Sequence, residues 1–255
     1  MRILISNDDG IQSIALRILA QELVKLGNVY ISAPSHEQSG VGHGITAHIP
    51  LRVQRVDFSG ITEYAWGVDG TPADCVKLAI EKLMPEKPDI VISGINYGAN
   101  LGTDVIYSGT VAAAMEGFLF GLPAIAISAT GVRRGVGEGN FLLAATKTAE
   151  ICRLWQQRNF QPRTMLNINV PGHKPEDVQG CRFTKLGWRW YSDAYEERLD
   201  PHGRPYYWLQ GSVNDGEGDG STDVEACKAG FISLTPLFND LTDNKALEQI
   251  KHILD

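Results

Sequence analysis

Short apolar runs alternate with segments of helical periodicity along the first half of the chain. Residues 3–5 form an apolar run that predicts a short buried strand. Apolar residues then recur every three or four positions over 11–26, which predicts a helix that ends near Gly27. A second apolar run at 29–33 predicts another strand. This order predicts two parallel strands joined by a right-handed crossover.

The same alternation continues to about residue 130. It predicts further strands at 51–56, 64–68, 88–94 and 124–128, and helices at 71–83 and from 110 to at least 117. Alternating strands and helices predict an α/β fold, a Rossmann-like, doubly wound and mostly parallel sheet. We expect residues 1–130 to form one Rossmann-like core.

The second half has a different pattern. It predicts a helix at 141–157 and a strand at 165–170, and then aromatic residues gather around a polar turn at 200–203. This cluster predicts a long β-hairpin extension whose aromatic residues serve packing or subunit contact rather than substrate binding. Residues 246–254 carry one apolar helical stripe, which predicts a terminal helix that docks on its own core or on a neighbour. We expect residues 131–255 to complete the core and to add the hairpin and a C-terminal oligomerisation helix.

Composition excludes several classes of function. The 255-residue chain has a net charge of −7, and its lysines and arginines form no long cluster, which disfavours binding to a nucleic-acid duplex. No apolar stretch is long enough to span a bilayer, and no secretory signal is visible, so we expect a cytoplasmic protein without membrane contact. Four widely separated cysteines indicate buried thiols rather than disulfides or a zinc site.

Asp8 and Asp9 stand side by side at the end of the first predicted strand. Two adjacent carboxylates repel each other unless a cation or a proton lies between them, and hard divalent cations prefer such oxygen ligands. For an isolated pair, a helix cap beside a solvated aspartate is an equally good interpretation.

Three strand ends carry polar loops, at 7–10, 38–40 and 93–96. Ligands of open parallel sheets bind beyond the carboxyl ends of the strands, so we expect these loops to meet. Together they offer two carboxylates, a hydroxyl and a side-chain amide. This all-oxygen set favours Mg²⁺, Mn²⁺ or Ca²⁺, with positions left for water or substrate.

A Ser-Gly-Thr sequence at 108–110 stands immediately before a predicted helix. Its amides and hydroxyls would point to where an anion binds, although simple helix capping is the alternative. Gly94, Gly98 and Gly102 would allow the backbone to approach a ligand closely. A cation site and a helix N-terminus together predict a phosphate pocket.

These motifs resemble the SurE family of metal-dependent nucleotide phosphatases. The resemblance is carried by ILISNDDG, APSHEQSG, GTPADCV, SGINYGANLGTDVIYSGTVAAAMEG and TDVEACKAGFISLTPL. It implies that Asp8, Asp9, Ser39 and Asn96 ligate one divalent cation, Mg²⁺ or Mn²⁺. It also implies hydrolysis of nucleoside 5′- or 3′-monophosphates, in some members short polyphosphate, by homodimers or homotetramers that exchange the hairpin and C-terminal helix.

The chain departs from the family pattern in loops that would face substrate. Residues 11–16 lack the usual Pro-Gly, Ser35-His36-Glu37 replaces Asp-Arg-Asn, and 44–48 differ from the usual sequence. These loops affect substrate specificity more than they affect metal binding.

The predicted reaction is metal-assisted hydrolysis of a phosphomonoester, in which the cation neutralises phosphoryl oxygens and lowers the pKa of a bound water. One aspartate of the pair would take the proton of the attacking water. We expect the catalytic residues to be Asp8, Asp9, Asn96 and Ser108, and the residues that bind phosphate to be Ser39, Gly40, Asn96, Asn100, Ser108, Gly109 and Thr110.

Three alternatives compete with this hypothesis. A phosphoaspartyl phosphatase usually has an acid two residues after its nucleophile, where this chain has Gly10. A dinucleotide-dependent dehydrogenase would need a GxGxxG turn, which the first strand does not carry. The third alternative is a nucleotide sensor that keeps the cation but has lost turnover.

Overall fold

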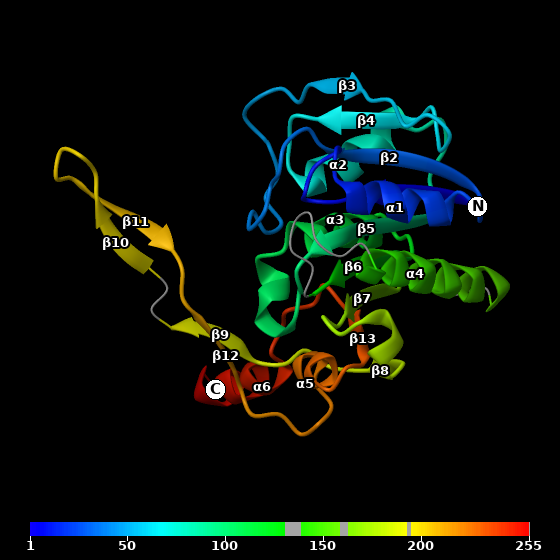
Figure 1. The fold of residues 1–255 in the computed structure, drawn as a ribbon. Coiled ribbons are helices and arrows are strands. Elements are labelled where there is room, and N and C mark those ends of the chain that lie inside the picture. Colours follow the sequence, from blue (N-terminus) through cyan, green and yellow to red (C-terminus); the bar gives the residue numbers. More distant parts are fainter. Residues whose placement is uncertain (131–138, 159–162, 193–194, 255) are drawn as a thin grey trace.

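A mixed β-sheet runs through the centre of the computed structural model, which describes residues 1–130, 139–158, 163–192 and 195–254 (Figure 1). Within these residues the sheet has the order β3-β4-β2-β1-β5-β6-β7-β13-β8. From β4 to β7 the neighbouring strands are parallel, whereas β3 and β13 run antiparallel to β4 and β7. The strands are β1 Arg2–Ser6, β2 Asn28–Pro34, β3 Val53–Arg55, β4 Ala65–Val68, β5 Ile90–Tyr97, β6 Ala124–Ala129, β7 Met165–Val170, β8 Cys181–Phe183 and β13 Ile232–Leu237.

Helices cover both faces of this sheet, which confirms the predicted α/β, doubly wound architecture. Helices α1 and α4 pack together over one face, and α2 and α3 pack together over the other. The helices are α1 Ile14–Leu23, α2 Pro72–Leu78 with its π-helical continuation η1 Ala79–Leu83, the 3₁₀ turns η2 Gly102–Ile106 and η3 Pro175–Asp177, α3 Gly109–Leu119, α4 Gly139–Arg158, α5 Asp223–Lys228 and α6 Asn244–Leu254.

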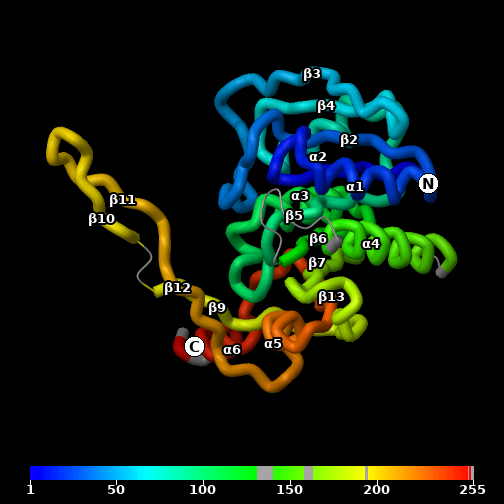
Figure 2. The backbone as a smooth tube through the Cα atoms, in the orientation of Figure 1, coloured from blue at the N-terminus to red at the C-terminus, as the bar shows by residue number. Residues whose placement is uncertain are grey.

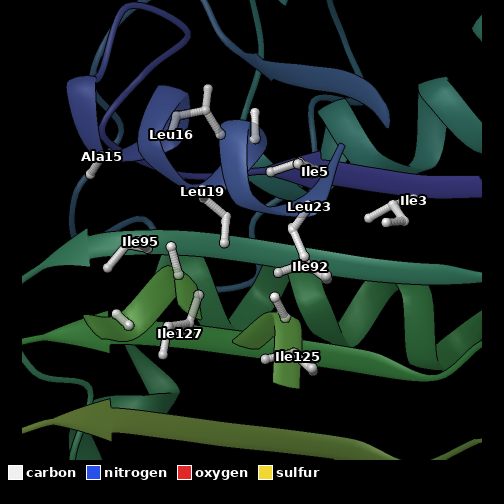
Figure 3. Close-up of a cluster of buried hydrophobic side chains, with 14 of the residues drawn as sticks. Ile3, Ile5, Ala15, Leu16, Leu19, Leu23, Ile92, Ile95, Ile125 and Ile127 are labelled. Carbon is white, nitrogen blue, oxygen red and sulfur yellow. The ribbon is translucent and has the colours of Figure 1, made fainter. Parts of the chain in front are cut away.

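The apolar strands contribute to two cores at once. Successive residues of a strand point to opposite faces, so Ile3 and Ile5 join the core under α1 and α4 while Leu4 joins the core under α2 and α3. Figure 3 shows the first of these cores, where Leu16 and Leu19 of α1 lie over the central strands. Burial on both faces explains why these strands are continuously hydrophobic.

The sheet order places a ligand crevice between β1 and β5. From β1 the chain crosses by α1 to β2 on one side, and after β4 and α2 it returns to β5 on the other side of β1. At such a switch point the loops beyond the carboxyl ends of the two strands diverge and open a crevice. Asp8 and Asp9 follow β1 and Asn96 lies near the end of β5, so all three belong to this edge.

Two antiparallel pairs form the predicted hairpin extension, which projects away from the sheet (Figures 1 and 2). The inner pair joins β9 Arg189–Ser192 to β12 Ser212–Asp215, and the outer pair joins β10 Tyr195–Leu199 to β11 Pro205–Leu209. The predicted terminal helix is also present as α6.

Several boundaries differ from the sequence prediction. Helix α1 begins at Ile14 rather than Ile11, because the amide of Ile11 binds the carbonyl of Pro34 and residues 10–13 form a turn. Strand β5 continues past Gly94 to Tyr97, so Asn96 belongs to a strand rather than to a loop. The short elements β8, β13 and α5 were not predicted.

The cysteines agree with the prediction at three positions and contradict it at the fourth. All four thiols are free, and Cys75, Cys152 and Cys227 are buried. Cys181 is exposed, because it lies on β8 at the edge of the sheet. Among the described helices, none has the length and apolar character needed to cross a bilayer.

Candidate active site

Most of the predicted site residues line one cleft at the switch point between β1 and β5. The cleft has a volume of about 740 Å³. The predicted residues along its wall are Asp8, Ser39, Gly40, Asn96, Asn100 and Ser108. Of the remaining predicted residues, Asp9 follows Asp8 and Gly109 follows Ser108 in the chain, and Thr110 comes next after Gly109.

Asp8 is held against the N-terminus of α3. The hydroxyl of Thr110 donates to its Oδ1 at 2.6 Å, and the Thr110 amide donates to its Oδ2 at 3.1 Å. Gly109 permits this contact, because a Cβ there would lie 2.9 Å from the Cβ of Asp8. The positive end of the helix dipole also favours a carboxylate at this position.

The electrostatic surroundings of Asp8 are unusual for a carboxylate. Its side chain is only 4% exposed, and burial raises its pKa above the ordinary value although the hydrogen bonds from Thr110 act in the opposite direction. The charge of Glu37 raises the pKa further. The burial of Asp8 and the nearby charge of Glu37 therefore create a place where a cation would be stabilised.

Asn7 shapes the turn that separates Asp8 from Asp9. Its Nδ2 donates to the carbonyl of Gly10 at 3.0 Å, and the amide of Gly10 donates to its Oδ1 at 3.2 Å. The carboxylate of Asp9 then accepts from the amide of Tyr97 at 3.3 Å. Adjacent carboxylates thus contact different elements, Asp8 at α3 and Asp9 at the end of β5.

An irregularity in β5 sets the position of Asn96. The pairing of β5 with β6 shifts between Ser93 and Asn96, and the Nδ2 of Asn96 donates to the carbonyl of Gly98 at 3.0 Å. Our expectation for the glycines needs correction here. Gly94 packs against the carbonyl of Ile127, and Gly102 packs against the carbonyl of Gly187, so neither position faces the cleft.

Ser39 belongs to an exposed loop that is tied to Asp8. The amide of Gln38 donates to the backbone carbonyl of Asp8 at 2.8 Å. The hydroxyl of Ser39 donates to Oε1 of Glu37 at 2.9 Å. Glu37 is one of the residues that depart from the family pattern, and its charge acts on Asp8.

The predicted phosphate-binding residues have defined positions and partners. The Oγ of Ser108 accepts from the amide of Val111 at 3.1 Å, so this serine caps α3 while it lines the cleft. Thr110 uses both its amide and its hydroxyl on Asp8, so it positions Asp8 instead of offering these groups to phosphate. Its role in phosphate binding stays a prediction.

A buried polar cluster fixes Asn100. Its Nδ2 donates to the Oγ of Ser128 at 2.7 Å, and its amide donates to Oδ1 of Asn169 at 2.8 Å. The Nδ2 atoms of Asn167 and Asn169 in turn donate to its carbonyl. Sequence reasoning missed Asn167 and Asn169. The signal that could have found them is that two asparagines occupy alternate positions of an otherwise apolar strand.

The donor set fits a hard divalent cation. Asp8, Asp9, Ser39 and Asn96 supply carboxylate, hydroxyl and amide oxygens, as Mg²⁺ and Mn²⁺ prefer. In the described part of the chain, no cluster of three or more histidine, cysteine or acidic side chains suits a metal ion. The hydroxyl of Ser39 and the amide of Asn96 are oxygen donors, which suit Mg²⁺ or Mn²⁺ better than zinc.

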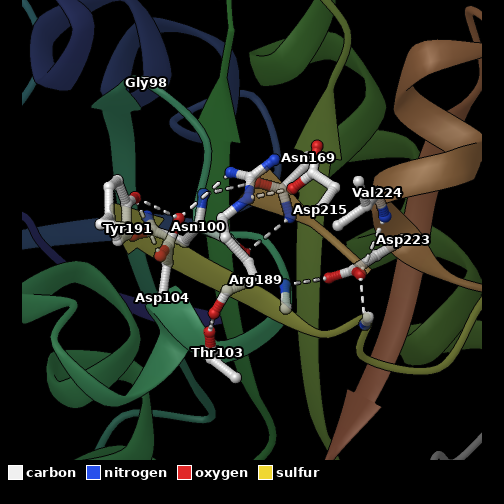
Figure 4. Close-up of polar contacts among 12 residues, drawn as sticks. Gly98, Asn100, Thr103, Asp104, Asn169, Arg189, Tyr191, Asp215, Asp223 and Val224 are labelled. Carbon is white, nitrogen blue, oxygen red and sulfur yellow. Dashed lines mark hydrogen bonds and ion pairs between the residues drawn. The ribbon is translucent and has the colours of Figure 1, made fainter. Parts of the chain in front are cut away.

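Sequence reasoning also missed the other wall of the cleft. Asp104 and Tyr107 line it from η2 and the residue that follows, and Tyr191 and Tyr195 line it from the hairpin. The sequence favoured packing or subunit contact for the hairpin aromatics, and these two tyrosines also line the cleft. Figure 4 shows Tyr191 beside Asp104 and Asn100.

Comparisons with known proteins agree on one family. The profile described as "Survival protein SurE" matches residues 3–193. A protein named 5′-nucleotidase SurE from Heliobacterium modesticaldum is 46% identical over 250 residues, which cover 98% of this chain and 90% of that protein. Another of that name from Desulforudis audaxviator is 49% identical over 255 residues, with 98% and 96% covered. The crystal structure of the SurE protein from Aquifex aeolicus superimposes with a TM-score of 0.82, 38% identity and complete coverage of both chains.

Proposed function

The chain belongs to the SurE family, and we propose that it is a 5′-nucleotidase that uses one divalent cation to hydrolyse nucleoside monophosphates. The observation that carries the proposal is the meeting of Asp8, Ser39 and Asn96 with the N-terminus of α3 in one cleft. The names of the relatives support the substrate class, and the oxygen donors support the cation.

Asp8, Asp9, Ser39 and Asn96 would hold the cation. When bound, it would offset the charge of the phosphoryl oxygens and make a water molecule a better nucleophile. The contacts of the chain prepare this site: Thr110 holds Asp8, Tyr97 holds Asp9, and Gly98 orients Asn96.

The phosphate would lie against the N-terminus of α3. Ser108, Gly109, Gly40 and Asn100 would orient its oxygens as charge shifts during the reaction. The hydrogen bonds that fix Asn100 hold it in place before substrate arrives. The carboxylate of Asp8 or that of Asp9 would take the proton of the attacking water.

Phosphate release from a panel of substrates tests the proposal. The panel holds nucleoside 5′- and 3′-monophosphates, short polyphosphate and β-glycerol phosphate, each with Mg²⁺ or Mn²⁺ and with a chelator. We expect hydrolysis of nucleoside 5′-monophosphates that stops with chelator and returns when the cation is restored. Polyphosphate and 3′-nucleotides are the further substrates that the sequence suggested.

Site variants test the assignment of residues. Asp8→Asn and Asn96→Ala should each lower kcat by about 100-fold or more, because each removes a ligand of the cation. Mn²⁺ should raise the Tm of the wild type but not of Asp8→Asn, since a ligand stabilises only the state that binds it. Asp57→Asn, at an exposed carboxylate outside the cleft, is the matched control. Full activity in Asp8→Asn, or no hydrolysis of any nucleoside monophosphate by the wild type, would contradict the proposal.

We also propose that the chain assembles as a homodimer or homotetramer through the hairpin and α6. Helix α6 presents Leu247, Ile250 and Ile253 to solvent, and the outer strands of the hairpin expose Tyr207 and Trp208. Exposed apolar side chains grouped in this way support a subunit contact.

A further inference from the structure

The loop that carries Ser39 and Gly40 is long and largely exposed. Residues 35–52, all within the described part of the chain, form neither helix nor strand. Ser39 and Gly40 are themselves exposed, yet the proposed function places them at the cation and the phosphate. Ligands on such a loop keep their positions only where other contacts tie the loop to regular elements.

Gly42 ties this loop to the start of α3. Its amide donates at 3.0 Å to the carbonyl of Tyr107, which precedes the N-cap residue of the helix. Gly42 has a φ of +56°, and a Cβ there would lie 3.1 Å from the carbonyl oxygen of Ile106, so a glycine suits the close approach. A single backbone hydrogen bond in an exposed loop opens readily, so a second tie would matter.

His43 supplies a second tie, to a buried carboxylate further along α3. The Nε2 of His43 donates to Oε1 of Glu116 at 2.8 Å. The side chain of Glu116 is only 8% exposed, whereas that of His43 is 36% exposed. A buried carboxylate without a partner is costly, so burial of Glu116 favours the conformation of the loop in which His43 reaches it.

The position of Glu116 on α3 makes the two ties complementary. Glu116 follows Gly109 by seven residues, so about two turns separate them on one face of the helix. The loop therefore contacts α3 at its start and again about two turns later. Lys77 of α2 also faces the carboxylate, with its Nζ 4.0 Å from Oε2 of Glu116. Because Lys77 lies on α2, it can offset the charge of Glu116 without holding the loop.

We propose that the His43–Glu116 pair holds the loop of Ser39 and Gly40 against α3 and so keeps these ligands in place for the reaction. The proposal rests on the proposed function, which makes Ser39 a ligand of the cation and Gly40 a contact of the phosphate. Glu116 acts through His43, so it is a positioning residue rather than a catalytic one. The pair sets the place of Ser39 relative to Ser108 at the N-terminus of α3 before substrate arrives.

Hydrogen exchange and cation binding test the pair without turnover. In His43→Ala the amides of residues 38–46 should exchange about tenfold faster than in the wild type without cation, because the loop opens more often. Mass spectrometry of peptides from this segment measures the rates. The Mn²⁺ concentration that gives half of the full rise in Tm should increase about fivefold, because Ser39 is no longer held in place.

Kinetics measure the effect on the reaction. His43→Ala should lower kcat/KM about tenfold for 5′-AMP and for β-glycerol phosphate alike, because the loop serves the phosphate end that both substrates share. His43→Gln brings an amide donor near the same position and should restore most of the value. Glu116→Ala should match His43→Ala, and the double variant should be no worse than either, because all three remove the same contact.

Two control variants separate positioning from charge and from general damage. Lys77→Ala removes the other cation beside Glu116 but no contact of the loop. Because the side chain of Lys77 is 48% exposed, its loss should leave loop exchange and the Mn²⁺ response within about twofold of the wild type. His173→Ala removes an exposed histidine after β7 and should change none of the readings.

The outcomes separate this proposal from the proposed function. Unchanged loop exchange or an unchanged Mn²⁺ response in His43→Ala would overturn it, as would equal changes in Lys77→Ala or additive losses in the double variant. If Glu116→Ala fails to fold, the two His43 variants decide the question, because His43 is partly exposed. Failure of the wild type to hydrolyse any nucleoside monophosphate would overturn the proposed function alone, since loop exchange and the Tm are read without turnover.

Discussion

At the scale of single residues, the site depends on how two adjacent carboxylates are separated. The turn built by Asn7 sends Asp8 to the N-terminus of α3 and Asp9 to the end of β5. Each carboxylate then receives donors from a different element, which reduces the cost of holding two negative charges in neighbouring positions. Asp8 lines the cleft, and Asp9 follows it in the chain at the same edge of the sheet.

Thr110 is the residue whose loss should reveal this arrangement. Thr110→Val keeps the shape of the side chain but removes the hydroxyl that donates to Asp8 at 2.6 Å. We expect the free energy of unfolding to fall by about 1–3 kcal/mol, because a buried carboxylate loses a donor. We also expect kcat to fall about tenfold or more as Asp8 loses its fixed orientation.

Thr110→Ser is the matched control, because it keeps the hydroxyl and should keep most of the activity. Urea unfolding and steady-state kinetics at saturating Mg²⁺ measure the two effects. Wild-type kcat in Thr110→Val would show that the hydrogen bond does not position Asp8.

The sequence could predict the rim of the site but not its supports. Asp8, Ser39 and Asn96 stand where strands end, and the switch point of a parallel sheet brings strand ends together. Thr110 can hold Asp8 only because α3 lies close to the turn after β1. No local sequence pattern predicts that proximity. Tyr191 and Asp104 are 87 residues apart in the chain, so only the fold shows that they meet.

At the scale of elements, helix α2 shows how a cap can hold a loop as well as a helix. The hydroxyl of Thr71 accepts from the amide of Asp74, and the carboxylate of Asp74 accepts from the amide of Thr71, which completes a capping box. The same carboxylate accepts from the amide of Thr46 at 3.0 Å. One side chain therefore ties the loop before β3 to the start of α2.

Asp74→Asn should destabilise the fold in a pH-dependent way. Burial pushes the pKa of Asp74 up, but the hydrogen bonds from Thr46 and Thr71 outweigh it, so the pKa lies below the ordinary 3.8. The ionised form therefore favours the folded state: its contribution is complete above the ordinary pKa and is lost as the pH falls through the folded value. We expect a loss of about 1 kcal/mol at neutral pH, from the weakened cap.

Urea unfolding of the wild type and Asp74→Asn across this pH range measures the effect. The difference between them should shrink below about pH 4. Asp69→Asn removes an exposed carboxylate nearby and should show no comparable change. A difference that grows toward acid pH would reverse the assigned sign.

Strongly patterned elements were predicted well, and elements without a clear local pattern were not. The apolar runs of β1, β2 and β6 gave their strands directly, because burial on both faces makes a strand continuously hydrophobic. Strand β13 pairs antiparallel with β7 and contains Pro236, and α5 has only six residues. Their stability comes from contacts with the sheet rather than from a local signal.

At the scale of the whole molecule, the hairpin and α6 leave the sheet on the side of its last strands (Figure 1). The hairpin has a second function in the proposed site, since its base lines the cleft. Helix α6 has no such role, and its exposed apolar residues remain to be covered. In the proposed assembly the two extensions would differ in role: the base of the hairpin lines the cleft, whereas α6 would present its exposed apolar residues to another subunit.

The proposed assembly can be tested on α6 without disturbing the core. Leu247 is 43% exposed and Ile250 is 52% exposed, so replacing Ile250 by glutamate should cost the isolated subunit little. In a subunit contact the same change would bury a charge without a partner, which costs several kcal/mol. We therefore expect Ile250→Glu to convert the dimer or tetramer to monomers in light-scattering measurements. Lys245→Glu places a carboxylate on the polar side of the helix and should leave the mass unchanged. An unchanged mass in Ile250→Glu, with the wild type oligomeric, would exclude α6 from the contact.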